Sequence, residues 1–227
     1  MLADRAAIFS ELSLPELAGV SLATDTYRGM RYVDAIVALI AFVLILPVLV
    51  LIALAIKSTS PGPVIFAHDR VGLGGRMFFC LKFRSMALDA DDSLIALLAS
   101  DPAIGVEWTQ AHKLRKDPRI TRVGGFLRKT SLDELPQLLN VVRGEMSLVG
   151  PRPIVLAEIY RYGRYIRHYC SVRPGITGLW QINGRNNVSY ARRVALDVLY
   201  VRSRSLRLNL YILGMTFPSV IFADGTY

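Results

Sequence analysis

The stretch that decides the fold is the apolar run at residues 35–56, AIVALIAFVLILPVLVLIALAI, which holds 22 residues and no charge. As one straight helix it would be about 33 Å long, enough to cross the hydrocarbon core of a bilayer. Pro47 lies inside the run, and a proline within a helix removes a backbone hydrogen bond and bends the axis. The run therefore predicts either a spanning helix with a tolerated proline or a helix-break-helix hairpin that enters and leaves the same leaflet.

The flanks of this run do not choose between the two interpretations. Arg28 and Arg31 precede it, and Lys57, Arg70 and Arg76 follow it, so the positive-inside rule gives no preference between the ends. Both ends are therefore compatible with the cytoplasmic side. An acidic arm comes before the run and no small-residue cleavage site comes after it, so we do not expect a cleavable signal.

Length, charge and cysteine count limit the domain organisation and the classes of partner that the chain can have. With 227 residues, the chain has room for one compact domain and an attached segment. The net charge is +9, and the positive excess lies beyond residue 34, which suits nucleic acid, an anionic membrane surface or phosphorylated substrates. Cys80 and Cys170 are too few for a disulfide framework and lack metal-ligand spacing, so a reducing compartment is expected.

Downstream of the run the sequence predicts a hairpin and then helices. Proline and glycine in STSPGPVIF (58–66) end the apolar helix, and DRVGLGGRMFFCLKFRSM (69–86) predicts two short strands joined at a turn over 73–76. Residues 87–112 read as an acidic helix and a connector. The basic EIYRYGRYIRHY (158–169) and the segment ALDVLYVRSRSLRLNLYILGMTF (195–217) predict surfaces at a membrane interface, the latter as one amphipathic helix.

The predicted fold is α+β and mainly helical. It combines a membrane-embedded helix-break-helix, interfacial amphipathic helices and a small β-hairpin around a compact catalytic domain. We divide the chain into an N-terminal arm at 1–28, the membrane hairpin at 29–60 and the catalytic domain at 61–227.

Two adjacent carboxylates stand out in SLDELPQLL (131–139). Ser131 and Glu134 have the spacing of a capping box, whereas Pro136 favours Asp133 itself as the N-cap. Either register places Asp133 at a helix N-terminus, where the dipole and the nearby Arg128 should keep it ionised. Capping alone is the simpler interpretation of this pair.

The same pair also suits chemistry at phosphorus. Mg²⁺ is bound by a few carboxylates together with phosphate oxygens, so one carboxylate could attack phosphorus while its neighbour holds the metal. Arginine is the preferred side chain for phosphate, and Arg128, Arg152 and Arg185 lie in or near glycine-rich or proline-rich loops. No P-loop, dinucleotide fingerprint, zinc spacing or Ser-His-Asp arrangement stands out.

Four segments in this order resemble the bacterial sugar transferases called monotopic phosphoglycosyl transferases. They are KFRSM (82–86), DPRITRVGGFLRKTSLDELPQLLNVVRGEMSLVGPRP (117–153), RPGITGLWQINGRN (173–186) and LDVLYV (196–201), behind a proline-broken apolar segment. The resemblance covers residues 29–215. Larger members carry a multispan N-terminal region, so we expect a minimal catalytic form here.

The resemblance implies transfer of a hexose 1-phosphate from a UDP-sugar to undecaprenyl phosphate, with release of UMP, as the first membrane step of exopolysaccharide synthesis. Asp133 would be the nucleophile of a covalent intermediate and, with Glu134, would hold Mg²⁺. The residues expected to bind substrate phosphates are Lys82, Arg84, Arg128, Arg152 and Arg185. The sugar expected from the resemblance is glucose or galactose, and the location is the cytoplasmic face of the bacterial inner membrane, with Pro47 at the break of the membrane hairpin.

Two other functions stay open at this point. One is a glycosyl transferase that moves only the sugar and releases UDP. The other is a membrane-anchored basic binding module in which the carboxylate pair serves only as a cap. Aromatic residues are few near the basic loops, so nucleic acid is not an expected partner. Membrane lipid is an expected partner, and a homodimer is kept as a candidate assembly.

Overall fold

The structure, a computed structural model, describes residues 28–100, 104–105, 108, 114, 117–184 and 188–221. The predicted arm, apart from Arg28, and Arg185 of the predicted site lie outside these ranges. The helices are α2 (Arg28–Leu44), α3 (Leu46–Thr59), α4 (Ala90–Ser100), α6 (Arg122–Thr130), α7 (Gln137–Arg143), α8 (Ile159–Tyr162), α9 (Ile166–Cys170), α10 (Leu179–Ile182), α11 (Tyr190–Ser203) and α12 (Leu206–Ile221). The strands are β1 (Ile65–Val71), β2 (Met77–Phe83), β3 (Ser147–Val149) and β4 (Gly175–Thr177). The prediction of a mainly helical α+β fold is confirmed.

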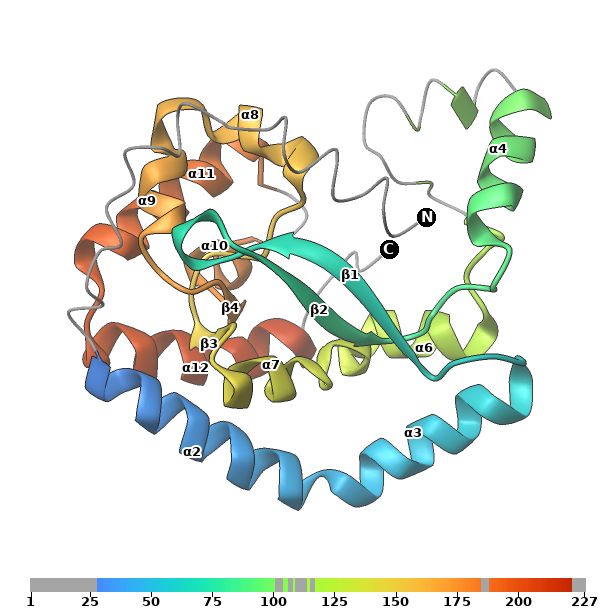
Figure 1. The fold of residues 1–227 in the computed structure, drawn as a ribbon, viewed down its shortest axis with the longest axis horizontal. Helices are drawn as coiled ribbons and strands as arrows, with labels where there is room; N and C mark the ends of the chain where they lie inside the picture. Colours follow the sequence, from blue (N-terminus) through green and yellow to red (C-terminus); the bar gives the residue numbers. More distant parts are fainter. Residues whose placement is uncertain are drawn as a thin grey trace.

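The apolar run forms two helices instead of one. Helices α2 and α3 meet at Ile45 with a bend of 62° and form an open V along one side of the molecule (Figure 1). Pro47 lies in the first turn of α3, where its missing N–H leaves the carbonyl of Val43 without the usual helical donor. The predicted break is confirmed. In the described part of the chain no single helix is long and apolar enough to span a membrane, whereas the bent pair is, by length and composition.

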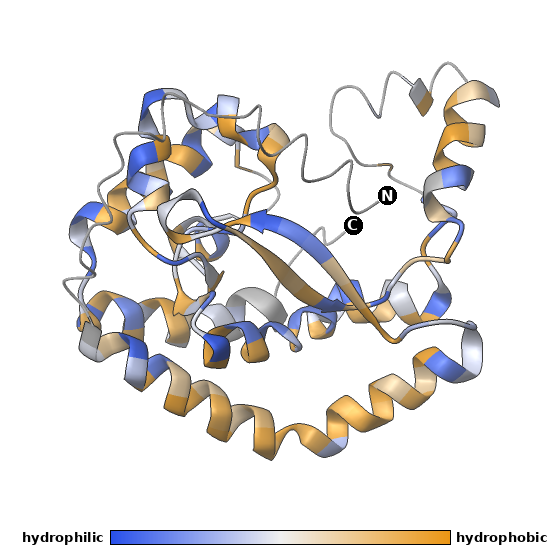
Figure 2. Ribbon diagram, viewed as in Figure 1, coloured by the Kyte–Doolittle hydropathy of each residue, from blue (hydrophilic) through white to orange (hydrophobic). Residues whose placement is uncertain are grey.

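One face of the V packs on the body of the protein. Ala38 of α2 contacts the cluster that contains Leu138 and Val141 of α7, and on α3 Leu49 and Ile52 pack against a cluster with Leu127 of α6. The other face is apolar but exposed. Both helices are hydrophobic over most of their length, with hydrophilic residues near their outer ends (Figure 2). The exposed large apolar side chains of the two helices are Tyr32, Val33, Ile36, Val37, Leu39, Ile40, Val43, Leu44, Leu46, Val48, Val50, Leu51 and Leu54.

The predicted hairpin is confirmed, and its first strand starts at Ile65, earlier than expected. Strands β1 and β2 are antiparallel, with Arg70 opposite Phe78 and His68 opposite Cys80. Directly opposite residues share a face of a sheet, and so do residues two apart. The register therefore places Arg70, Cys80 and Lys82 on one face.

The sequence did not predict the short parallel pair of β3 and β4, in which Val149 lies opposite Thr177. Its glycines permit close approach of two backbones. A Cβ on Gly175 would lie 2.0 Å from the amide nitrogen of Gly150, and one on Gly178 would lie 2.3 Å from the carbonyl oxygen of Gly150. This contact joins the loop after β3 to the segment that carries Trp180.

The prediction of one helix over 195–217 is wrong. Helix α11 ends at Ser203, Arg204 is extended, and α12 starts at Leu206. The Ser205 hydroxyl accepts a hydrogen bond from the amide of Leu208 at 3.2 Å, as an N-cap residue does, so the second helix has a start signal of its own. Helix α12 buries Ile212 and leaves Leu206, Leu210, Tyr211, Leu213 and Met215 exposed.

Candidate active site

Asp133 lies in a short 3-10 turn, Leu132–Glu134, between α6 and α7. Ser131 ends α6 in the left-handed conformation, at φ 57°, which turns the chain sharply. Leu132 and Leu135 then pack into the apolar cluster formed by α3, α6 and β2. With both leucines held there, Asp133 lines the cavity described below.

The register that starts after Ser131 is confirmed in position, since Asp133 lies in the first turn, but the Ser131 side chain does not cap it; the register with Asp133 as the N-cap of the following helix is wrong. Ser131 makes no side-chain cap hydrogen bond to the 3-10 turn, and the residue before α7 is Pro136, which has no side-chain acceptor. The turn ends before α7 begins at Gln137, so Asp133 does not cap that helix. The carboxylate therefore needs an explanation other than capping.

The side chain of Asp133 is buried, with the residue 8% exposed. Burial raises the pKa of its carboxyl to about 6, opposed by the positive charges of Lys82 and Arg128 and supported by the negative charge of Glu134. We predicted that cations would favour the ionised form, and they do lower this pKa, but burial has the larger effect. The carboxylate is still the main form at neutral pH.

Two cations anchor the carboxylate pair to neighbouring elements. Lys82 at the end of β2 donates to Oε1 of Glu134 over 2.6 Å, with both side chains less than a third exposed. Arg128 on α6 donates through Nε to the hydroxyl of Ser85, 2.8 Å away, and its charge acts on Asp133. Lys82 thus holds Glu134 in place, and Ser85 holds Arg128 where its charge acts on Asp133.

Of the other predicted phosphate-binding residues, Arg152 reaches the site and Arg84 is held elsewhere. Arg152 lies over the ring of Trp180, with 5.9 Å between the guanidinium carbon and the ring centroid. Arg84 donates to the carbonyl oxygens of Ser60 and Pro61, at 2.9 and 2.5 Å, and so fastens the linker after α3 to the end of β2. Two hydrogen bonds of Arg84 are thus directed to the backbone, although its side chain also lines the cavity.

These side chains line a cavity of about 620 Å³. A volume of that order accommodates a nucleotide-sized ligand. The cavity wall includes Asp133, Glu134, Lys82, Arg84, Arg128 and Arg152, so the structure brings together every predicted site residue on the catalytic domain that it describes.

Two arginines of the same wall were not predicted. Arg119 donates to both carboxylate oxygens of Asp117, at 2.8 and 2.6 Å, while Arg70 of β1 faces the cavity beside Lys82. The signal for Arg70 was present in the sequence: it precedes the predicted turn on the strand that pairs with the strand of Lys82. Strand alternation alone could have placed both on one face.

The residues present fit Mg²⁺ only if phosphate oxygens of a substrate complete its coordination shell. Among the described residues no group of three His, Cys, Asp or Glu side chains is arranged to hold a metal. Asp133 and Glu134 supply hard oxygen donors, and Mg²⁺ commonly takes one or two carboxylates with the rest of its shell from phosphate and water. The donor set therefore suits a magnesium ion that arrives with a phosphorylated substrate.

Comparison with known proteins identifies the family. The sequence model of the family "Bacterial sugar transferase" matches residues 26–223. This chain is a bacterial sugar transferase. The predicted resemblance is confirmed, and the matched range includes the bent helix pair as well as the cavity.

Three relatives of this sugar transferase illustrate how close the similarity is. It is 48% identical to the "UDP-galactose-lipid carrier transferase" of Erwinia amylovora over 99% of this chain and 47% of that one. It is 47% identical to the "Exopolysaccharide production protein ExoY" of Rhizobium meliloti over 96% of both chains. It is 42% identical to the "UDP-glucose:undecaprenyl-phosphate glucose-1-phosphate transferase" of Caulobacter vibrioides, over 87% of this chain and 71% of that one. The sugar transferase thus spans about half of the first relative and almost all of the second.

Proposed function

We propose that this sugar transferase moves a hexose 1-phosphate, glucose or galactose, from a UDP-sugar to undecaprenyl phosphate and releases UMP. The observation that carries the proposal is the buried carboxylate of Asp133 in the wall of a large cavity lined by cations. The printed names of the relatives, which include a lipid carrier transferase and a glucose-1-phosphate transferase acting on undecaprenyl phosphate, support the substrate classes. Exopolysaccharide synthesis is the pathway class we propose.

The reaction would proceed in two steps through Asp133. In the first, a carboxylate oxygen of Asp133 forms a bond to the phosphorus that carries the sugar, and the bond to the bridging oxygen breaks. That oxygen keeps the electron pair and leaves as part of UMP. In the second, a phosphate oxygen of the lipid forms a bond to the same phosphorus and the carboxylate is released. Neither step requires a proton, because every attacking and leaving group is an anion.

The neighbouring side chains would stabilise charge during both steps. Arg128 and Lys82 lie close enough to Asp133 to lower its pKa, so they also lie near the phosphorus that it attacks. The salt bridge between Lys82 and Glu134 fixes both side chains before substrate binds. Such preorganised charges stabilise a phosphoryl transfer transition state more effectively than water does.

Mg²⁺ is the cofactor that we propose, held by Glu134 and Asp133. When bound with the diphosphate it would neutralise negative charge on the phosphate oxygens. Removing divalent cations with a chelator should therefore suppress turnover, and adding Mg²⁺ should restore it.

The bent helix pair is proposed as a re-entrant hairpin in the cytoplasmic leaflet of a bacterial inner membrane. Helix α2 has 17 residues and α3 has 14, so the arms are about 26 and 21 Å long. Both outer ends of the V rise toward the body of the protein (Figure 1), and the exposed apolar face surrounds the bend at Ile45. A hairpin inserted by its bend would keep Arg31 and Lys57 on the side where UDP-sugars are found.

A nucleotide-release assay tests this proposal. The purified chain is incubated with undecaprenyl phosphate, Mg²⁺ and each member of a panel of UDP-sugars, and the nucleotide product is identified. UMP release with UDP-glucose or UDP-galactose, abolished in Asp133→Asn, is the expected result. Release of UDP would instead indicate a transferase of the sugar alone, and no release with any donor would count against the enzyme assignment.

A further inference from the structure

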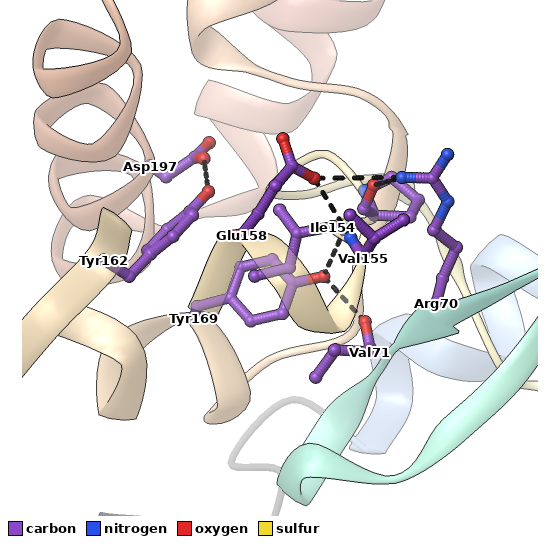
Figure 3. Close-up of polar contacts among 9 residues, drawn as sticks. Arg70, Val71, Ile154, Val155, Glu158, Tyr162, Tyr169 and Asp197 are labelled. Atoms are coloured by element: carbon purple, nitrogen blue, oxygen red, sulfur yellow. Dashed lines mark hydrogen bonds and ion pairs between the residues drawn. The ribbon is translucent and has the colours of Figure 1, made fainter. Parts of the chain in front are cut away.

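Arg70 is a half-buried cation whose role the proposed mechanism does not use. It extends from β1 toward the segment that contains Val155 and Glu158 (Figure 3), and its side chain is 16% exposed. Its NH1 donates to the carbonyl of Pro153 at 3.2 Å and lies 3.9 Å from Oε2 of Glu158. That carboxylate oxygen already accepts a hydrogen bond from the amide of Val155 at 3.0 Å. Within the described residues, the contact with Pro153 is the one hydrogen bond that the side chain of Arg70 makes.

Arg152 is in a similar state. It stacks on Trp180 and makes no hydrogen bond to any residue that the structure describes. Arg70 and Arg152 line the same small recess, and the positive charge of Arg152 adds to the effect of burial in lowering the pKa of Arg70. Two partly buried cations that repel each other are costly unless an anion lies between them.

The arrangement of charge around the cavity identifies where that anion belongs. Lys82 is paired with Glu134, and Arg119 is paired with Asp117. Arg70 and Arg152 have no comparably close carboxylate, yet both line the large cavity and a small recess beside it of about 20 Å³. The recess also contains Lys82 and Glu134 in its wall, so it adjoins the carboxylate pair.

We propose that Arg70 and Arg152 together form a phosphate-monoester subsite that is used twice in each catalytic cycle. The proposal rests on the proposed function. In the first step the bridging oxygen leaves as part of the phosphate of UMP, and in the second step the phosphate of the lipid attacks the same phosphorus. Both groups are phosphate monoesters, and both must lie on the side of the phosphorus opposite to Asp133. One dianion site can therefore hold the leaving phosphate and then the incoming one.

The double use also explains why this site carries two forked cations. Arginine donates in pairs to phosphate oxygens, and the two side chains come from different elements, β1 and the loop after β3. The subsite recognises only the phosphate group. The uridine of UMP and the polyprenyl chain of the lipid, each attached to its own phosphate, would extend from the subsite in different directions.

The test compares Arg70→Gln with the charge-matched control Arg192→Gln, an exposed arginine on α11 that lines neither the cavity nor the recess. Binding of UMP and of uridine to the full-length chain is measured by calorimetry, which needs no turnover. We expect Arg70→Gln to weaken UMP binding at least about tenfold, as loss of a charged hydrogen bond does, and to leave uridine binding unchanged. Arg192→Gln should match the unmodified protein for both ligands.

Kinetics then distinguish a shared site from a UMP site alone. The KM for undecaprenyl phosphate and the inhibition constant of UMP should rise by similar factors in Arg70→Gln, with an intermediate rise in Arg70→Lys, which keeps the charge and loses the fork. Unchanged UMP affinity in folded Arg70→Gln and Arg70→Lys would overturn the subsite. A higher inhibition constant for UMP with an unchanged KM for undecaprenyl phosphate would overturn the double use of the subsite. Failure of the proposed function looks different, since the unmodified chain would then release no UMP from any donor.

Discussion

Replacing the proposed nucleophile should make the protein more stable. Burial raises the pKa of Asp133 from its usual 3.8 to about 6, so the fold prefers the neutral carboxyl. The stability gained from that preference is complete below about pH 4 and is lost as pH rises through about 6. Above that pH the charged side chain costs the fold about 3 kcal/mol, from a shift of about two pKa units at 1.36 kcal/mol each. Asp133→Asn removes the charge and keeps the shape.

The assay is denaturant unfolding of the full-length chain in detergent, followed by tryptophan fluorescence. Asp133→Asn and the unmodified protein should have similar stability near pH 4, and the variant should be more stable by up to about 3 kcal/mol near pH 8. The control is Asp117→Asn, because hydrogen bonds from Arg119 lower the pKa of that carboxyl in spite of its burial. Asp117→Asn should destabilise the protein above pH 4. A stability difference for Asp133→Asn that is independent of pH, or of the opposite sign, would refute the reasoning.

Three further predictions concern the rate, the helix packing and the hairpin. The rate of UMP release should fall about tenfold per unit well below pH 6, because the attacking carboxylate becomes protonated, and single-turnover measurements across pH check this. Gly124→Ala should destabilise the protein and lower activity, because a Cβ there would lie 1.9 Å from the backbone oxygen of Ser85. Gly125→Ala should be tolerated in both assays, because the nearest atom to a Cβ there is a methyl carbon of Ile120 at 3.9 Å, an ordinary van der Waals contact. Pro47→Ala should restore the missing helical donor and reduce the 62° bend. The distance between spin labels at the outer ends of α2 and α3 should then increase. An unchanged distance would show that packing on α6 and α7, not the proline, sets the bend.

Local signals in the sequence predicted the elements that depend on local chemistry. Pro47 marked the break in the apolar run, and the glycines at 74 and 75, both at positive φ, marked the turn of the hairpin. The parallel pair of β3 and β4 could not be predicted in this way. It forms between segments more than 20 residues apart and depends on the close approach of Gly150 and Gly175, which is a tertiary contact. The end of α11 was missed because Ser205, the residue that starts α12, was read as part of a continuous helix.

For the candidate site, too, the sequence predicts part of what the structure shows. Residue type and spacing identified Asp133, Glu134 and the arginines, but not how each side chain is used. Asp133 looked like a cap because sequence spacing does not reveal that Ser131 takes a left-handed conformation and that the turn ends before α7. The expectation that Arg84 binds phosphate comes from the family resemblance and stays a prediction; its hydrogen bonds to the carbonyl oxygens of Ser60 and Pro61 depend on the packing of the chain, which the sequence does not reveal. Strand alternation could have placed Arg70 beside Lys82, whereas its proximity to Arg152 depends on a tertiary contact between β1 and the loop after β3.

The most direct test of the account is a search for the covalent intermediate. The protein is incubated with a UDP-sugar and Mg²⁺ in the absence of lipid acceptor, quenched, digested and analysed by mass spectrometry. We expect one hexose phosphate on the peptide that contains Asp133, no such adduct in Asp133→Asn, and loss of the adduct when undecaprenyl phosphate is added. Turnover of the UDP-sugar to UMP without an adduct at Asp133, or with full activity in Asp133→Asn, would contradict the central claim that this carboxylate is the nucleophile.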